Sequence, residues 1–371
     1  MQRRKVLFLI QSLGGGGAEK VLVNLVNNMD KTRYEITVMA LFGGGVNEQY
    51  LAPHIHLKNV WKKTFPGNTV ILKCFSPERL HTLFVKDEYD IEVAYLEGSA
   101  HRIVSGCRNP NTKIYAWQHS TPFSERRARL GYRSMREAQR YFGRFSRIVC
   151  VADTIRQRFL EWHPDLKNVT VVYNTNESEK ILALSREPLD NDTFRDDELS
   201  IIGVGKITEN KGFDRLAGIH ARLRKEGIPV HTYILGEGEA RPELQGLIDQ
   251  LGIADSFTLL GYQTNPYKFV SKADLFVCSS HSEGFSTAAT EALIVGTPVC
   301  SVEVSGMKEM LGNNNEYGFV TENDDEALYQ GIRRLFIKPE LLEYYRTQAH
   351  VRGNAFSTEN TVAAVERLFE E

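Results

Sequence analysis

Short apolar runs alternate with longer amphipathic stretches along most of the chain. Residues 6–10, 35–41 and 91–96 are largely apolar, whereas residues 18–29 carry apolar side chains at helical spacing. Further strands are expected at 113–117, 147–151, 169–173, 200–204, 231–235, 256–260, 273–279 and 298–302, and further helices at 154–162 and 213–226. Runs of continuous rather than alternating apolar residues are typical of strands buried on both faces. The pattern therefore predicts an α/β fold with parallel sheets covered by helices.

The alternation is interrupted between residues 174 and 199. This stretch holds eight acidic residues and Pro188 and has little apolar periodicity, which is typical of a solvated linker. A chain of 371 residues is also long for one domain. We therefore expect two Rossmann-like, doubly wound domains that face a central cleft. Their expected bounds are 1–176 for the N-terminal domain, 177–198 for the linker, 199–353 for the C-terminal domain and 354–371 for a C-terminal helix that could cross back to the first domain.

Composition narrows the function classes. With 42% hydrophobic and 25% charged residues the chain is globular, and its net charge of −2 provides no general attraction to nucleic acid. The five cysteines are scattered without a CxxC pair, so neither a disulfide framework nor a zinc cage is indicated. No apolar run approaches the roughly 18 residues of a membrane-spanning helix. The apolar run after the basic N-terminus is too short for a signal peptide, so we expect a cytoplasmic protein with reduced, buried thiols.

Two glutamates separated by seven residues mark the most informative segment. It follows a predicted buried strand and reads Glu283-Gly284-Phe285-Ser286-Thr287-Ala288-Ala289-Thr290-Glu291. The glycine allows a turn, and Ser286 and Thr287 can cap a helix that carries Glu291. If the segment were helical throughout, the two glutamates would be about 12 Å apart along the axis, which suits the two ends of one extended polar ligand. Backbone N–H groups at 284–287 would attract an anion between them.

A glycine-rich loop follows the first strand of each predicted domain. The two loops read Gly14-Gly15-Gly16-Gly17-Ala18-Glu19-Lys20 and Gly203-Val204-Gly205-Lys206-Ile207-Thr208-Glu209-Asn210-Lys211-Gly212. Glycines let backbone N–H groups approach a phosphate, and a helix that starts after the loop adds its positive end. Lys206 and Lys211 could both point at a diphosphate and neutralise its charge as a nucleotide leaves. A plain flexible turn and a solvated basic loop are the alternatives.

Together these motifs resemble those of retaining glycosyltransferases with the GT-B fold, in particular glycosyltransferase family 4 (glycosyl transferases group 1). The acidic pair matches the EX7E signature, and Gly16 and Gly17 match the family's glycine pair. The second loop matches a Gly-Arg…Lys-Gly motif, with Lys206 where Arg is more usual, and lysine lacks arginine's rigid fork. The resemblance implies that His119, at the end of a predicted strand, contacts the donor sugar near the reacting centre. A structural role is the alternative for a single histidine.

The resemblance also implies a division of roles. Glu283 would bind hydroxyls of the donor sugar, and Glu291 those of the ribose. The lysines, the glycines of both loops and the 284–287 backbone would hold the departing diphosphate. The loops that contain Gly236, Glu237 and Tyr262, each after a predicted strand, would surround the base and ribose. The alternative is that these loops are tight turns required only by the fold. The residues expected at the donor site are Gly16, Gly17, Gly205, Lys206, Lys211, Gly236, Glu237, Tyr262, Glu283, Gly284, Phe285, Ser286, Thr287 and Glu291, with His119, Lys206, Lys211 and Glu283 as the catalytic set.

The implied reaction moves a sugar from a nucleotide-sugar, UDP being favoured over GDP, to a glycan or lipid-linked glycan with its anomeric configuration kept. Bacterial surface polysaccharide or glycoconjugate synthesis is the expected setting. No metal or other cofactor is expected, because lysines and helix ends can hold the diphosphate. Asp190-Asn191-Asp192 matches a DxD metal motif, but it lies in the predicted acidic linker with no strand before it. A nucleotide-sugar epimerase or phosphorylase of the same architecture stays an alternative. An NAD-dependent oxidoreductase is less favoured because the first loop lacks a complete GxGxxG.

Residues 123–147 form a strongly basic stretch with two glutamates and interleaved apolar side chains. Its arginines are Arg126, Arg127, Arg129, Arg133, Arg136, Arg140, Arg144 and Arg147, and its apolar members are Phe123, Leu130, Tyr132, Tyr141, Phe142 and Phe145. Such a stretch can lie on an anionic membrane surface or bind a lipid pyrophosphate. Nucleic-acid binding and a solvated helical face are the alternatives. We favour peripheral contact with the inner face of the membrane and expect no nucleic-acid partner.

Overall fold

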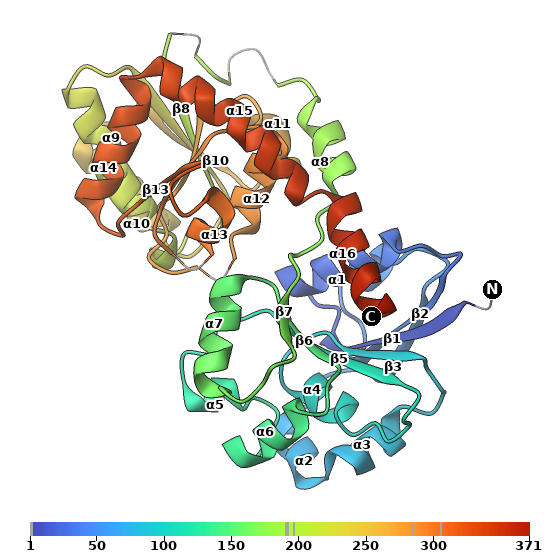
Figure 1. Cartoon of the computed structure of the whole chain (residues 1–371). Coiled ribbons are helices and arrows are strands. Elements are labelled where there is room, and N and C mark those ends of the chain that lie inside the picture. Colours follow the sequence, from blue (N-terminus) through green and yellow to red (C-terminus); the bar gives the residue numbers. More distant parts are fainter. Residues whose placement is uncertain (1–2, 190–192, 196, 284, 305) are drawn as a thin grey trace. The chain divides into compact units, whose positions relative to one another are not determined.

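The computed structural model describes residues 3–189, 193–195, 197–283, 285–304 and 306–371 (Figure 1). The chain forms two compact units. Unit 1 comprises Met1–Asn176 together with Thr358–Glu371, and unit 2 comprises Glu177–Ser357. Each unit contains one parallel sheet with helices packed against it, so the predicted two-domain α/β fold is confirmed.

Unit 1 contains a seven-stranded sheet in the order β3-β2-β1-β4-β5-β6-β7. Its strands are β1 (Arg4–Ser12), β2 (Tyr34–Phe42), β3 (His56–Trp61), β4 (Ile91–Ala94), β5 (Lys113–Gln118), β6 (Arg147–Cys150) and β7 (Val169–Val171). Its helices are α1 (Gly17–Asn28), η1 (Glu48–Tyr50), α2 (Asn68–Cys74), α3 (Pro77–Phe84), α4 (Ser99–Val104), α5 (Glu125–Ala128), α6 (Met135–Phe142), α7 (Asp153–Trp162) and α16 (Thr358–Glu370). The apolar centre of β1 is fully buried, which explains its uninterrupted hydrophobic run.

Helix α16 belongs to unit 1 although it lies at the far end of the sequence. It packs beside α1, and its Glu366 accepts a hydrogen bond from the backbone N–H of Asp30 at 2.8 Å. The ring of Phe369 is fully buried and lies 5.2 Å from the ring of Tyr115 on β5. The segment after residue 357 therefore completes the core of the unit that contains the N-terminus.

Unit 2 contains a six-stranded sheet in the order β10-β9-β8-β11-β12-β13. Its strands are β8 (Leu199–Val204), β9 (Val230–Leu235), β10 (Phe257–Gly261), β11 (Leu275–Cys278), β12 (Val299–Val302) and β13 (Phe319–Thr321). Its helices are α8 (Ser178–Ser185), η2 (Glu209–Lys211), α9 (Phe213–Lys225), α10 (Arg241–Leu251), α11 (Tyr267–Val270), α12 (Thr287–Ile294), α13 (Met307–Leu311), α14 (Asp325–Phe336) and α15 (Pro339–Ala355). Helices lie on both faces of this sheet (Figure 1).

The strand order fixes where the loops of each unit meet. Chain order reverses between β1 and β4 in unit 1 and between β8 and β11 in unit 2. The loops that leave two such neighbouring strands diverge to opposite faces, and ligands of doubly wound sheets bind at this switch point. The first glycine-rich loop follows β1, and the second follows β8. The 283–291 segment follows β11, the strand that pairs with β8.

The structure differs from the sequence-based expectation at two edge strands and in the segment between the two sheets. The strands β3 and β13 are absent from the predicted set; both are edge strands, and none of their residues is buried. Residues 177–198, expected as a solvated linker, begin with helix α8, whose Ile181 is buried and which packs on α11 and α12. No helix in the described part of the chain is long and apolar enough to cross a membrane.

Candidate functional site

The switch point of unit 2 brings Lys211 and Glu283 together. Lys211 ends η2 after β8, and Glu283 lies in the loop after β11. The Lys211 ammonium forms an ion pair with Oε1 of Glu283, and the same oxygen accepts a hydrogen bond of 2.7 Å from the Ser280 hydroxyl. Both charged side chains are largely buried, with 26% and 14% of their surface exposed. The structure thus places the lysine and the first glutamate of the predicted site in one partly desolvated ion pair.

Close backbone packing holds these two loops in register. Gly212 has a φ of +62°, and a Cβ atom there would lie 2.2 Å from the Ser279 carbonyl oxygen, so a side chain is excluded at this position. The His281 N–H donates to the Asn210 carbonyl at 2.8 Å, and the Asn210 amide donates to the Ser282 carbonyl at 2.8 Å. The loops are therefore joined on both sides of the Lys211–Glu283 pair, which favours a preorganised site.

The second predicted lysine has a different environment. Lys206 is two-thirds exposed, and its ammonium lies 2.7 Å from Oε2 of Glu239, an equally exposed side chain. Gly205 lies against the stem of Lys211, since a Cβ atom on Gly205 would be 3.1 Å from the Lys211 Cε atom. The two lysines are thus not equivalent: Glu283 fixes Lys211, whereas Lys206 lies in solvent beside an acidic partner.

The loops after β9 and β10 also meet the second glycine-rich loop. Gly236 has a φ of +145°, and a Cβ atom there would be 1.9 Å from the Gly205 carbonyl oxygen. Glu237 accepts a hydrogen bond of 2.7 Å from Arg241 on α10, so its carboxylate is neutralised within unit 2. Tyr262 is 74% exposed, which leaves its ring available at the surface.

Helix α12 carries the second glutamate of the predicted pair. Its N-cap is Ser286, whose hydroxyl accepts a hydrogen bond from the Ala289 N–H at 3.3 Å, and its first residue is Thr287. The capping prediction is confirmed, but the segment is not helical throughout because Glu283 precedes the helix in a loop. Gly284 lies outside the described residues. The ring of Phe285 packs edge-on against that of Phe356 at 6.0 Å.

Glu291 is positioned by a tyrosine from a neighbouring helix. The Tyr267 hydroxyl on α11 donates to Oε1 of Glu291 at 3.1 Å. Burial of the phenol, together with the Glu291 charge, raises the pKa of Tyr267 well above its usual range. The phenol therefore remains a hydrogen-bond donor at neutral pH, and it orients the carboxylate on which the ribose role was predicted.

Unit 1 places His119 directly after β5 and holds it through a carboxylate that the sequence analysis missed. Oε1 of Glu97, in the loop after β4, accepts hydrogen bonds from the backbone N–H groups of His119 at 2.6 Å and Ser120 at 2.7 Å. The Ser120 hydroxyl donates to the same oxygen at 3.0 Å. The strands β4 and β5 are adjacent, so the loops that follow them meet. A polar residue shortly after the predicted strand at 91–96 was therefore the only feature of the sequence that could have indicated Glu97.

Burial keeps the His119 imidazole neutral. It lowers the pKa of His119 to about 3, while the backbone of Tyr95 acts in the opposite direction. The imidazole lies 4.9 Å from the Tyr95 ring, and its Nε2 atom is buried and makes no hydrogen bond among the described residues. A neutral imidazole can donate or accept one hydrogen bond to a ligand hydroxyl without carrying charge.

The first glycine-rich loop leads into α1, with Gly16 at the N-cap and Gly17 as the first helical residue. Glu19 lies in the first turn, and a Cβ atom on Gly16 would be 2.3 Å from its Oε2 atom. A carboxylate near the positive end of a helix is favourable. Glu19 thus lies beside the predicted phosphate contact, and its carboxylate occupies the space next to Gly16.

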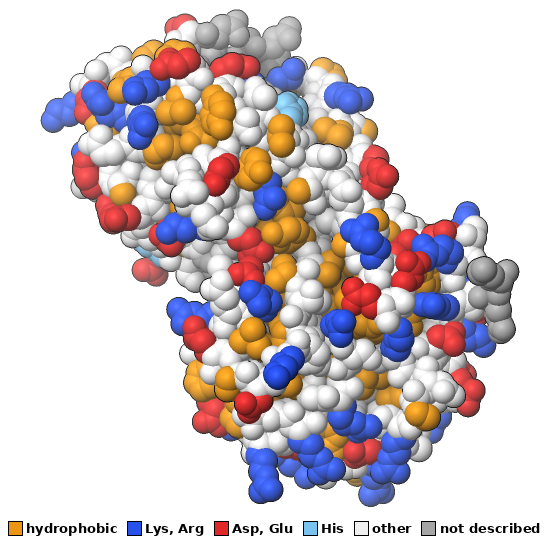
Figure 2. Space-filling model, in the orientation of Figure 1, with side chains coloured by type: hydrophobic (Ala, Val, Ile, Leu, Met, Phe, Trp, Pro, Cys, Tyr) orange, Lys and Arg blue, Asp and Glu red, His pale blue; other side chains and the backbone are white. Residues whose placement is uncertain are grey.

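The basic stretch of residues 123–147 contains two short helices, α5 and α6. Four of its apolar members, Tyr132, Tyr141, Phe142 and Phe145, are buried in the core of unit 1, so they are not available for membrane contact, whereas Phe123 is exposed. Seven of the eight arginines are exposed. Figure 2 shows Lys and Arg side chains gathered at the end of unit 1 where Figure 1 places α2, α3 and α6.

Family comparisons match both halves of the chain. Residues 15–176 match the model described as Glycosyltransferase Family 4, and residues 186–352 match that of Glycosyl transferases group 1. The residues of the first glycine-rich loop from Gly15 onward and His119 fall in the first match. The Lys211–Glu283 pair falls in the second.

Among curated relatives, the chain is 31% identical to the Campylobacter jejuni enzyme named N-acetylgalactosamine-N,N'-diacetylbacillosaminyl-diphospho-undecaprenol 4-alpha-N-acetylgalactosaminyltransferase, over 51% of this chain and 50% of that one. It thus spans about half the length of that relative. It is 27% identical to the Rhizobium meliloti lipopolysaccharide core biosynthesis glycosyltransferase LpsD, over 88% and 87% of the two chains. The fold matches that of Anabaena HepE, solved in complex with UDP, with a TM-score of 0.77 over 99% of both chains at 18% identity.

Proposed function

Because the chain belongs to the glycosyltransferases, with a family 4 region followed by a group 1 region, we propose that it moves a sugar from a nucleotide-sugar to a hydroxyl of a glycan or lipid-linked glycan. The ion pair of Lys211 with Glu283 carries this proposal. It lies at the switch point of a GT-B unit, where doubly wound folds bind nucleotides. Its two members offer an ammonium for phosphate and a carboxylate for sugar hydroxyls.

The charges of the site suit departure of a nucleoside diphosphate. As the bond to the anomeric carbon breaks, negative charge grows on the leaving phosphate. The Lys211 ammonium, backbone N–H groups at the start of α12 and, at the periphery, Lys206 would stabilise that charge. Glu283 would accept hydrogen bonds from the sugar, and Ser280 keeps its carboxylate oriented. Glu291, held by Tyr267, would bind the ribose.

We propose that the anomeric configuration is kept. The proposal rests on the resemblance of the Glu283–Glu291 motif to that of retaining enzymes. Because Glu283 is paired with Lys211 and Glu291 with Tyr267, we do not propose a covalent sugar intermediate on either carboxylate. The acceptor hydroxyl would then attack from the face that the diphosphate leaves, and its proton would pass to the departing phosphate. His119, kept neutral by burial, would donate a hydrogen bond to a sugar hydroxyl rather than act as an acid.

UDP is the proposed nucleotide, and an oligosaccharide carried on a lipid diphosphate or a lipopolysaccharide core is the proposed acceptor class. Anabaena HepE, which shares the fold, is solved with UDP. The two curated relatives described above are named for a diphospho-undecaprenol-linked sugar and for lipopolysaccharide core synthesis.

A donor panel tests this proposal. The purified chain is incubated with UDP- and GDP-sugars, with and without lipid-diphosphate-linked glycans, and release of UDP or GDP is measured. We expect release of UDP that depends on the acceptor and a product one sugar longer whose anomeric configuration is read by NMR. Conversion of the donor without any acceptor would instead identify an epimerase. A requirement for free phosphate would identify a phosphorylase.

We further propose that the basic end of unit 1 contacts an anionic membrane. Exposed arginines on α5 and α6 lie in the same unit as exposed apolar side chains on α2 and α3, namely Val70, Ile71 and Leu83. Phe123, at the start of the stretch, is 76% exposed. Basic groups near an anionic surface contribute about 1 kcal/mol each, and a few apolar side chains add burial in the interface.

Liposome sedimentation tests the membrane proposal. Replacing Arg126, Arg127, Arg136 and Arg140 by alanine should reduce binding to vesicles that contain anionic phospholipid. The matched control replaces four exposed basic residues of unit 2, namely Lys225, Lys272, Arg334 and Lys338, by alanine. This control changes the net charge equally and should leave binding unchanged. Equal loss in both variants, or none in either, would mean that residues 123–147 are simply solvated.

A further inference from the structure

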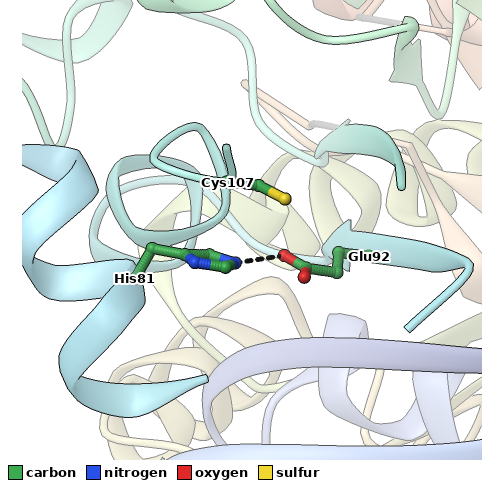
Figure 3. Close-up of side chains that lie close together, drawn as sticks. All are labelled: His81, Glu92 and Cys107. Atoms are coloured by element: carbon green, nitrogen blue, oxygen red, sulfur yellow. Dashed lines mark hydrogen bonds and ion pairs between the residues drawn. The ribbon is translucent and has the colours of Figure 1, made fainter. Parts of the chain in front are cut away.

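Three side chains that can ligate a metal ion lie close together inside unit 1. They are His81 on α3, Glu92 on β4 and Cys107 in the turn after α4. Nε2 of His81 lies 2.8 Å from Oε2 of Glu92, and one ligand atom from each of the three residues lies within 4.8 Å of the others. Figure 3 shows the imidazole and the carboxylate pointing toward one another, with the Cys107 sulfur beside them.

The cluster is buried and its charges are compensated internally. Glu92 and Cys107 are buried, and the His81 side chain is 15% exposed. A buried carboxylate is costly unless it is paired. Nε2 of His81 is the partner of the buried Glu92 carboxylate within the cluster.

We propose that His81, Glu92 and Cys107 bind one divalent transition-metal ion, with zinc as the best match. An imidazole nitrogen, a thiolate and a carboxylate oxygen are all established zinc ligands, whereas magnesium and calcium prefer oxygen atoms alone. A divalent ion with one thiolate and one carboxylate is electrically neutral, which a buried site requires. Ligand atoms around tetrahedral zinc lie roughly 3.5 Å apart. Nε2 of His81 and Oε2 of Glu92, which lie 2.8 Å apart, would therefore separate slightly, and shifts of about 1 Å would bring the remaining ligand atoms into place.

The fold, not a sequence motif, creates this site. The three residues come from a helix, a strand and a turn, so no CxxC or similar spacing marks them. A bound ion would join α3 to β4 and to the end of α4. Because β4 itself leads to Glu97, the ion would brace the framework of unit 1, and its role would be structural. The inference is independent of the proposed sugar transfer.

Equilibrium dialysis followed by elemental analysis tests the proposal on the full, tag-free chain. The protein is stripped with a chelator, dialysed against zinc chloride at micromolar concentration and analysed for bound metal. We expect about one zinc ion per chain and a higher midpoint of thermal unfolding. Cys107→Ala and His81→Gln should bind at least roughly tenfold more weakly. Cys300→Ala, which removes a buried thiol from unit 2, should bind like the parent chain.

Cobalt supplies a readout that does not depend on the stability of the variants. Addition of cobalt chloride to the stripped parent chain should produce a thiolate-to-cobalt charge-transfer band in the near ultraviolet, and Cys107→Ala should lack it. Absence of that band in the parent chain would overturn the proposal even if the variants fail to fold. Stoichiometric zinc retained by Cys107→Ala, with circular dichroism like that of the parent, would overturn it as well.

Discussion

Replacing Lys211 by alanine, and comparing the result with Lys206→Ala, tests whether the two lysines of the second glycine-rich loop contribute differently to catalysis. Lys211 is largely buried and paired with Glu283, while Lys206 is two-thirds exposed and paired with Glu239. If both lysines served the diphosphate equally, their alanine variants would behave alike. The structure predicts instead that Lys211→Ala is far more damaging than Lys206→Ala.

The expected magnitudes follow from the two environments. Loss of one preorganised charge-stabilising donor in a water-excluded site typically costs about 2.7–4 kcal/mol, or roughly 10²–10³ in kcat. Lys211 has that setting because Glu283, Ser280 and the joined loops fix its position. An exposed charge pair is worth about 0–1 kcal/mol, which corresponds to at most roughly fivefold. Lys206→Ala should therefore remain within that range.

Glu283→Ala should lose at least about 10² in kcat/KM, and the double variant with Lys211→Ala should be no slower than the worse single variant. Residues that act as a unit are strongly non-additive. The assay is acceptor-dependent UDP release, with Lys225→Ala as the control for a surface charge. Near-normal turnover of Lys211→Ala, or a fully additive double variant, would refute the reasoning from the ion pair.

Three further predictions test other parts of the structure. Glu97→Ala should lower kcat roughly 10–100-fold by releasing the His119–Ser120 backbone without changing UDP affinity, and Glu97→Gln, which keeps an acceptor, should restore much of it. Glu291→Ala should chiefly weaken UDP binding in calorimetry; unchanged affinity would exclude the ribose role. His220 is fully buried, and burial lowers its pKa to about 3, so the folded state binds fewer protons than the unfolded state below about pH 6.5. Chemical unfolding should therefore show about 2.3 kcal/mol lost between pH 6.5 and 4.5 from this residue, a loss that His220→Gln should lack.

The sheets could be predicted where burial imposed a continuous apolar run. Residues 6–10, 231–235 and 298–302 match the centres of β1, β9 and β12 for that reason. The edge strand β3 was missed because it covers less core and carries Lys58 and Asn59 with little apolar patterning. Helix α8 was missed because the acidic residues around it outweigh the short apolar pattern that contains Ile181.

The candidate site was predictable only where local sequence carries the chemistry. The loops with Lys211 and Glu283 stand out by their glycines, spacing and position after strands. Glu97 has no motif of its own; its importance arises because β4 and β5 are neighbours. The aromatic residues of the 123–147 stretch were interpreted as part of a membrane-facing surface because they are interleaved with arginines, yet Tyr132 and Phe142 lie in the core of unit 1. Both the position of Glu97 and the burial of these aromatic residues depend on contacts between segments that are distant in the sequence, which local patterns do not reveal.

The binding position of the nucleotide tests the central claim most directly. A crystal of the full chain soaked with UDP should show the diphosphate within hydrogen-bonding distance of Lys211 and of the backbone at the start of α12. The ribose hydroxyls should lie on Glu291. A diphosphate bound away from residues 206–211 and 283–291, or no nucleotide bound at millimolar UDP, would contradict the account.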